Sequence, residues 1–386
     1  MNDGYCLVLA GGGTRGAYQL GAWNALKETG ISIQAIAGTS IGAINAAFII
    51  QGDTEKMEQL YYNINIDDVM DAEIDMKKNK SLFSISNIVK VARDYVRHKG
   101  FSNEPLRKLL ENNLDLEKIY TSDIDFGLVT YSIKDHKPLE ILKKDIKRDE
   151  FVQYLLASAC FPIYKAQKIG ENVFLDGGLY DNLPINMMIK ANYKRFIVID
   201  SSAIGMRRGL ISKDVYIKFI RPSESLGGIF EFDREKIKKN ILLGYLDTLK
   251  AFSRLQGHRY YFKTDDFNEV LMKFNLQTIA GLEFAAKVYG MDQYKIYNSN
   301  DFFSELLNRH HEATERYNKI KKVSGITAVI KEYESIKHLL HKDLILCFFI
   351  DKISDEPLFS AFGDNIPFSD YIAAGRALIE LENQGY

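Results

Sequence analysis

The feature that most constrains the fold is a pair of apolar runs near the start of the chain, each passing through glycines into a helical pattern. The first run is Tyr5–Ala10, and a helical pattern follows it over Gly16–Glu28. The second run is Ile31–Ala37, and apolar residues recur at helical spacing over Ile41–Phe48. Short apolar runs that alternate with helices are typical of buried parallel strands. This part of the chain therefore predicts a mainly parallel sheet with helices on its faces.

The rest of the chain divides into a part that continues this α/β pattern and a part that does not. Further strands are expected at five apolar runs, of which the first two form a hairpin: Ile124–Tyr131, Pro138–Leu142, Asn172–Leu175, Arg195–Asp200 and Val215–Ile220. Residues 51–120 are polar and helix-rich, and we hypothesise that they cover a site; within them, Leu82–Val96 is interpreted as an ordinary packed helix rather than an interfacial one. Beyond about residue 265, charged and aromatic-rich helical patterns dominate. We therefore predict an α/β domain over residues 1–265 and a helix-rich region over residues 266–386.

Composition narrows the class of protein. Among 386 residues, 50 are Lys or Arg and 51 are Asp or Glu, and the net charge of −1 gives no general attraction to nucleic acid. The three cysteines are far apart and odd in number, so no disulfide framework is indicated, and Cys6 and Cys160 are expected in the core. The N-terminus lacks a signal-peptide pattern, and the longest apolar runs are too short to span a bilayer. We expect a cytoplasmic protein that meets any membrane substrate peripherally, from the aqueous side.

The second strand-to-helix transition carries a G-x-S-x-G pattern formed by Gly38, Ser40 and Gly42. A nucleophilic serine on a sharp strand-to-helix turn needs small neighbours, and the N-terminus of the following helix favours developing negative charge. The alternative is a plain turn with a capping serine. On this pattern alone the two interpretations are evenly balanced.

The first transition carries three consecutive glycines within Gly11–Gly16. The segment fits the dinucleotide-binding pattern G-x-G-x-x-G, but that function needs an acidic residue at the end of the next strand, where this chain has Ile36-Ala37-Gly38. A second interpretation is an oxyanion hole, because consecutive glycines expose backbone N–H groups to a carbonyl oxygen. Arg15 would then add positive charge or anchor the loop. A tight packing turn is the third interpretation.

A third pattern, Asp176-Gly177-Gly178, follows a short strand. Alone it is ordinary turn chemistry. All three patterns lie at the ends of apolar strands, and in a parallel sheet such ends gather on one edge, where ligands bind. A nucleophile, an anion-stabilising loop and a base would then share one crevice.

With these three patterns in this order, the chain resembles the patatin-like phospholipases over roughly residues 4–265. Ala157–Pro162 and Gly177–Pro184 are also similar to blocks of that family. The resemblance implies a three-layer α/β/α patatin-like fold with a helix-rich C-terminal extension, and a catalytic dyad in which Ser40 is the nucleophile and Asp176 its partner. It implies an oxyanion hole formed by Gly11, Gly12 and Gly13 with Arg15 nearby. The motif-supporting glycines are Gly16, Gly38, Gly42, Gly177 and Gly178.

The resemblance further implies cleavage of fatty acyl esters of phospholipids or other acyl lipids, with no metal and no cofactor. The histidines favour a dyad, because none carries a catalytic signature; His258 is the best third member, but a structural role is preferred. His310 and His311 are interpreted as lying on a solvated helix face. Two alternatives stay open: an esterase or thioesterase acting on soluble acyl substrates, and a catalytically inactive lipid-binding protein. The sequence leaves the head group, the acyl position and the oligomeric state undetermined.

Overall fold

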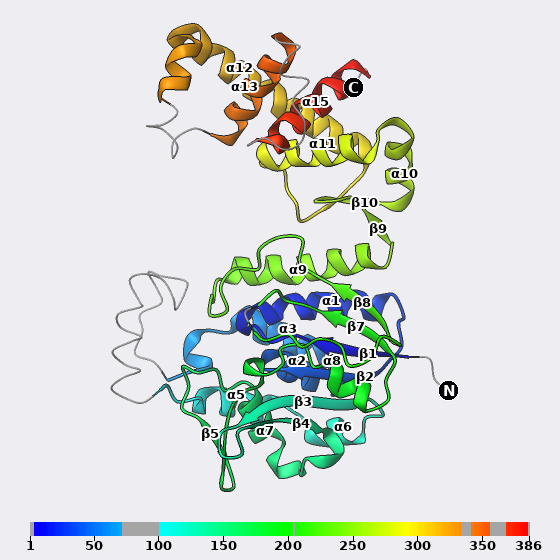
Figure 1. Ribbon diagram of the computed structural model, residues 1–386, viewed down its shortest axis with the longest axis vertical. Coiled ribbons are helices and arrows are strands. Elements are labelled where there is room, and N and C mark those ends of the chain that lie inside the picture. Colours follow the sequence, from blue (N-terminus) through cyan, green and yellow to red (C-terminus); the bar gives the residue numbers. More distant parts are fainter. Residues whose placement is uncertain (1–3, 72–99, 204, 333–340, 356–367, 385–386) are drawn as a thin grey trace. The chain divides into compact units, whose positions relative to one another are not determined.

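The computed structural model describes residues 4–71, 100–203, 205–332, 341–355 and 368–384 (Figure 1). The chain forms two compact units, Met1–Ala251 and Phe252–Tyr386. The division falls earlier in the chain than the boundary expected near residue 265. The segment Leu82–Val96, interpreted above as a packed helix, lies outside the described residues.

The first unit is built around an eight-stranded sheet in the order β5-β6-β3-β2-β1-β7-β8, with β4 also paired to β3. Five strands run parallel to one another, whereas β4 and β6 are antiparallel to β3, and β5 is antiparallel to β6. The predicted mainly parallel α/β sheet is therefore confirmed. The strands are β1 (Tyr5–Leu9), β2 (Ile33–Thr39), β3 (Asp125–Ser132), β4 (Lys137–Leu142), β5 (Gln167–Ile169), β6 (Asn172–Asp176), β7 (Arg195–Ile199) and β8 (Tyr216–Ile220).

Helices cover both faces of this sheet, as a three-layer fold requires. They are α1 (Gly16–Glu28), α2 (Ile41–Ile50), α3 (Thr54–Asn63), α5 (Glu104–Asn113), α6 (Leu116–Thr121), α7 (Phe151–Ser158), α8 (Ile185–Lys190) and α9 (Arg234–Ala251). Neighbouring residues of β3 show the two faces, because successive side chains of a strand point to opposite sides. Gly127 faces Met187 of α8, and the ring of Phe126 lies 5.2 Å from that of Phe151 in α7. The core thus lies on both sides of the sheet.

Two glycines bring α1 and α9 into close contact, and Figure 1 shows the two helices lying side by side. A Cβ atom added to Gly21 would lie 1.7 Å from the carbonyl oxygen of Ile241, and one added to Gly244 would lie 1.9 Å from that of Tyr18. Each glycine therefore accepts the backbone of the other helix at a distance that no side chain permits. This packing holds α1, and hence the glycine loop that precedes it, in a fixed position.

The second unit is mainly helical and contains a small three-stranded sheet. Its strands are β9 (Leu255–Gln256), β10 (Tyr261–Lys263) and β11 (Ile296–Tyr297), in the order β11-β10-β9, and its helices are α10 (Thr264–Lys273), α11 (Leu276–Val288), α12 (Ser299–Glu332), α13 (Lys342–Asp355) and α15 (Ser369–Asn383). The small sheet was not predicted, because strands of two or three residues are too short to show alternation.

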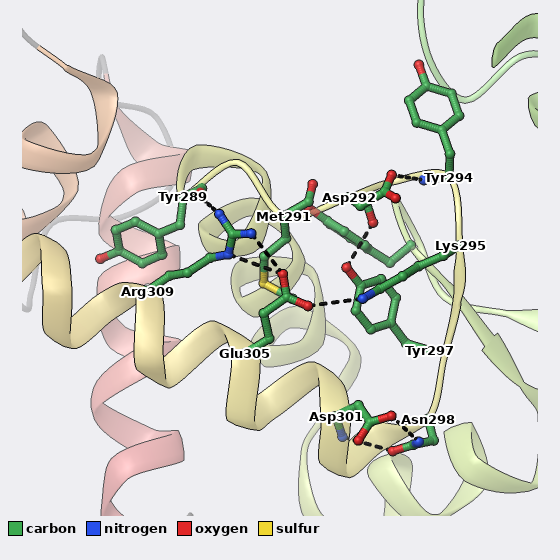
Figure 2. A network of polar contacts seen from close by, with 11 residues as sticks. Tyr289, Met291, Asp292, Tyr294, Lys295, Tyr297, Asn298, Asp301, Glu305 and Arg309 are labelled. Carbon is green, nitrogen blue, oxygen red and sulfur yellow. Dashed lines mark hydrogen bonds and ion pairs between the residues drawn. The ribbon is translucent and has the colours of Figure 1, made fainter.

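A polar network fastens the start of α12 to the segment that precedes it (Figure 2). Arg309 donates to the backbone carbonyl of Tyr289 at 3.1 Å and pairs with Glu305 at 3.0 Å. Glu305 also pairs with Lys295 at 3.1 Å. The Tyr297 hydroxyl donates to the carbonyl of Asp292 at 2.9 Å. These polar contacts lie beside the buried rings of Tyr289 and Tyr297, and together they connect α12 to the chain between α11 and α12.

Buried polar side chains of the second unit form hydrogen bonds within the protein. Glu283, which is fully buried, accepts hydrogen bonds from the backbone N–H groups of His258, Arg259 and Tyr260. The solvated-face interpretation is wrong for His310, which is buried and shares a 2.7 Å hydrogen bond with the hydroxyl of Tyr289. Burial lowers the pKa of His310 to about 4. Tertiary packing therefore buries His310, although its neighbours in the sequence are polar.

Candidate active site

Ser40 occupies a strained turn between β2 and α2. Its φ and ψ angles are 57° and −126°, a conformation that costs a non-glycine residue free energy and that tends to mark functional sites. The Ser40 N–H donates to the hydroxyl of Ser158 at 3.0 Å, and that hydroxyl donates to the carbonyl of Val129 at 2.7 Å. The buried Ser158 therefore connects the turn to Val129 of β3 and supports the strained conformation.

The glycines on either side of Ser40 are required by space. A Cβ atom added to Gly38 would lie 2.2 Å from the carbonyl carbon of Gly42, and one added to Gly42 would lie 2.3 Å from the carbonyl oxygen of Leu9. The helix can begin directly at the end of the strand only because both positions lack a side chain. This is the close packing that the sequence pattern predicted for a nucleophile turn.

Asp176 lies beside Ser40, although the reason given by the sequence pattern for their meeting is wrong for this residue. Its strand, β6, is antiparallel to β3, so a parallel-sheet argument would place its end at the opposite edge. Instead, β3 continues past its last pairing with β2, which is at Val129, and β6 pairs with the overhanging residues Thr130–Ser132. Asp176 is opposite Thr130, one position beyond the end of β2, where Ser40 follows.

The surroundings of Asp176 suit a proton acceptor. The carboxyl group is buried and accepts hydrogen bonds from the Gly178 N–H at 2.7 Å and from the side chain of Ser40. Burial raises the pKa of Asp176 to about 6, and the two hydrogen bonds oppose that rise. Desolvation thus gives the aspartate a pKa closer to neutrality than its usual value, which improves it as a base at neutral pH.

The glycine loop presents two backbone amides to the same site. Within the described ranges, the amide nitrogens of Gly12 and Gly13 donate no hydrogen bond to protein, and both residues line the cavity that contains Ser40. The amide of Gly11 is different, because it donates to the side-chain oxygen of Asn182 at 3.0 Å. Gly13 has a φ of 57°, and an added Cβ would lie 2.0 Å from the carbonyl oxygen of Ile229. The loop conformation therefore depends on glycine.

Arg15 anchors the loops around the site. Its guanidinium group donates to the backbone carbonyls of Gly227 at 2.9 Å and Ser202 at 2.7 Å. Of the two roles considered from the sequence, this geometry favours the anchoring role over direct charge stabilisation. The adjacent Thr14 N–H donates to the carbonyl of Ile229 at 2.9 Å, which fastens the same loop.

Ser40, Asp176 and the glycine loop open into one cavity of about 360 Å³, within the size range of small-molecule sites. No histidine of the described chain lines it. Most of the wall is apolar, and α3 and α5 supply part of it, which agrees with the hypothesis that residues 51–120 cover a site. The main apolar lining residues are Ile41, Ile44, Phe48, Met57, Leu60, Val69, Leu106, Leu109, Phe161, Pro162, Ile229, Phe230 and Phe232.

Two residues that hold the site were not assigned a role from the sequence. Ser158 positions the Ser40 turn, and Asn182 connects the loop after Asp176 to Gly11. Both lie in the blocks Ala157–Pro162 and Gly177–Pro184 that resemble the family. The sequence therefore marked these segments but did not indicate what the two residues do. Their roles depend on contacts between segments more than a hundred residues apart.

Among the residues that the structure describes, no three His, Cys, Asp or Glu side chains cluster as a metal ion would require. Within the same ranges, no helix combines the length and the apolar composition needed to cross a bilayer.

Comparison with known proteins agrees with this geometry. Residues 7–189 match the family model described as patatin-like phospholipase, so the resemblance predicted from the three motifs is confirmed over that part of the chain. The chain is 31% identical over 208 residues to a probable lipid hydrolase 463L of Invertebrate iridescent virus 6, covering 49% of this chain and 64% of that protein. It is 27% identical over 202 residues to the protein YqhO of Bacillus subtilis, covering 47% and 66%. It thus spans just under two thirds of the length of these curated relatives.

Among solved structures, the chain is similar to VipD from Legionella pneumophila, with a TM-score of 0.43 and 13% identity over 98% of this chain and 91% of that one.

Proposed function

We propose that the protein is a lipid acyl hydrolase that cleaves fatty acyl esters through Ser40 and Asp176. The observation that carries this proposal is the hydrogen-bonded Ser40–Asp176 pair inside an apolar cavity that also presents the amides of Gly12 and Gly13. The match of residues 7–189 to the patatin-like phospholipase model and the similarity to a probable lipid hydrolase support the choice of substrate class.

In the first half-reaction, Asp176 accepts the proton of the Ser40 hydroxyl while the serine oxygen attacks the acyl carbonyl carbon. The carbonyl oxygen becomes negatively charged, and the Gly12 and Gly13 amides together with the N-terminus of α2 stabilise it. The bond to the alcohol then breaks, and the departing oxygen takes the proton from Asp176. The product is an ester between the fatty acid and Ser40.

In the second half-reaction, water replaces the alcohol. Asp176 accepts a proton from the water as its oxygen attacks the acyl-serine carbonyl, and the same amides stabilise the second oxyanion. Collapse returns the proton to Ser40 and releases the fatty acid. One aspartate thus serves as base and acid in both steps, which its pKa near 6 permits at neutral pH.

The test is labelling with a fluorophosphonate probe, followed by hydrolysis of monomeric and micellar acyl esters. Labelling should be abolished in Ser40→Ala and kept in Ser304→Ala, a matched change at an exposed serine of α12. Asp176→Asn should slow hydrolysis by about a hundredfold or more, the usual contribution of a general base.

Labelling that persists in Ser40→Ala, or near-full activity in Asp176→Asn, would refute the dyad. A folded wild-type protein that is not labelled and hydrolyses no ester would instead support the inactive lipid-binding alternative. Hydrolysis of monomeric esters with no gain on micelles would favour the soluble-substrate esterase.

A further inference from the structure

We propose that the loop after β7, with Leu179, forms a docking surface that seats the mouth of the cavity on a bilayer containing anionic phospholipid. This inference rests on the proposed function, since the surface would deliver a membrane lipid to Ser40. We define the docking surface as Leu179, Met206, Arg207, Arg208, Leu210 and Ile211.

Four aliphatic side chains of this surface are exposed. The exposed fractions are 46% for Leu179, 54% for Met206, 46% for Leu210 and 57% for Ile211. Single exposed apolar residues are ordinary, but a contiguous group beside a ligand cavity marks an interaction site. Leu179 both lines the cavity and reaches solvent, so the surface begins at the cavity's open edge.

Hydrogen bonds place Met206 beside the segment that carries Leu179. The Met206 N–H donates to the carbonyl of Gly178 at 3.0 Å, and the Asn182 N–H donates to the carbonyl of Met206 at 2.7 Å. The Arg208 guanidinium lies 4.3 Å from the ring centroid of Tyr180. The residues before and after Leu179, Gly178 and Tyr180, therefore both contact the loop.

The far end of the loop is fastened to α8. Asn186 donates from its side-chain nitrogen to the carbonyl of Gly209 at 2.8 Å and accepts from the Ile211 N–H at 3.0 Å. The exposed side chains are thus carried on a backbone that is hydrogen-bonded near both ends, so less ordering of the loop is needed when it meets a membrane.

The charge of the segment matches an anionic surface. Residues 202–221 contain five Lys or Arg and a single acidic residue, Asp214, which pairs with Lys194. Arg207 and Arg221 share one buried carboxylate, Asp200, so the three groups together keep a net positive charge. Basic residues around exposed aliphatic ones are the pattern by which peripheral proteins bind anionic bilayers, through electrostatic attraction and shallow apolar insertion.

The experiment measures binding of the full chain to vesicles of phosphatidylcholine alone or mixed with phosphatidylglycerol. All variants carry Ser40→Ala so that the lipid stays intact, and bound protein is measured by cosedimentation. Met206→Ser with Ile211→Ser should weaken partitioning onto the mixed vesicles about tenfold, because two half-exposed aliphatic side chains no longer insert. Arg208→Gln should weaken it about fivefold on the mixed vesicles only.

The matched control is Met272→Ser with Leu276→Ser, at side chains of the second unit that are 85% and 69% exposed. It should bind as the parent does. Equal losses in both double variants, or no loss in either, would overturn the docking surface. A changed oligomeric state in Met206→Ser/Ile211→Ser with unchanged vesicle binding would also overturn it, in favour of a contact between copies of the chain.

Failure of the docking surface and failure of the proposed function are distinguishable. Fluorophosphonate labelling and hydrolysis of a monomeric ester, measured with Ser40 intact, should not change in Met206→Ser/Ile211→Ser, because neither side chain lines the cavity. If Met206→Ser/Ile211→Ser loses vesicle binding and the wild-type protein is never labelled, the docking surface is supported and the proposed hydrolase activity is refuted. If the protein is labelled at Ser40 and all variants bind vesicles equally, the proposed hydrolase activity is supported and the docking surface is refuted.

Discussion

Replacing Asp176 by asparagine should stabilise the protein while it removes activity. The carboxyl group is buried, and its pKa is raised from 3.8 to about 6. A carboxyl whose folded pKa exceeds its unfolded value favours the folded state fully only below pH 3.8, and this contribution is lost as the pH rises through about 6. Two pKa units correspond to about 3 kcal/mol. Compared with a group that stays neutral, the aspartate therefore costs the native state about 3 kcal/mol at pH 8. At pH 4.5 the cost is about 1 kcal/mol, because the native carboxyl is then protonated while the unfolded one is largely ionised.

Asparagine avoids that cost and keeps the carbonyl oxygen that accepts from the Gly178 N–H. Asp176→Asn should thus raise the free energy of unfolding by up to about 3 kcal/mol at pH 8, and the gain should shrink to about 1 kcal/mol at pH 4.5. Urea denaturation at the two pH values measures it. The control is Asp123→Asn, at an exposed aspartate of the same unit, which should change little. A loss of stability at pH 8, or an equal gain at both pH values, would refute the claim that desolvation raises this pKa.

Three further predictions follow from the same contacts. The pH profile of kcat/KM should fall on the acid side through about pH 6, because Asp176 must be ionised to accept a proton, and a limb near pH 4 would contradict this. Ser158→Ala should lower kcat about tenfold to a hundredfold with little change in KM, since the Ser40 turn loses its support; steady-state kinetics beside Ser304→Ala measure this, and an equal effect of both would refute it. Glu283→Ala should destabilise the second unit by about 3 kcal/mol or more in urea denaturation, because three amides lose their acceptor; the exposed Glu312→Ala should change little, and similar losses would exclude this explanation.

Local sequence was enough to predict most elements of the first unit. Strands β1 and β2 and the helices α1 and α2 that follow them are formed by apolar spacing and by glycines at positions where a side chain would not fit. These features depend on residues close together in the chain, so a pattern can show them. The small sheet of the second unit was not predicted because its strands are too short to show a pattern. The burial of His310 was not predicted because its sequence neighbours are polar, and only contacts with distant segments bury it.

By itself the sequence determined which chemical groups are present and that each follows a strand: the nucleophile turn at Ser40, the exposed amides of the glycine loop and the aspartate at 176. Tertiary structure decided how they combine. Asp176 meets Ser40 because β6 pairs antiparallel with the part of β3 that extends beyond β2, a register that no local pattern encodes. The side chain of Asn182 accepts the hydrogen bond of the Gly11 amide, whereas Gly12 and Gly13 line the cavity with their amides unbonded to protein in the described ranges. Burial then raises the pKa of Asp176, because desolvation depends on every segment packed around a carboxyl group and not on its neighbours in sequence.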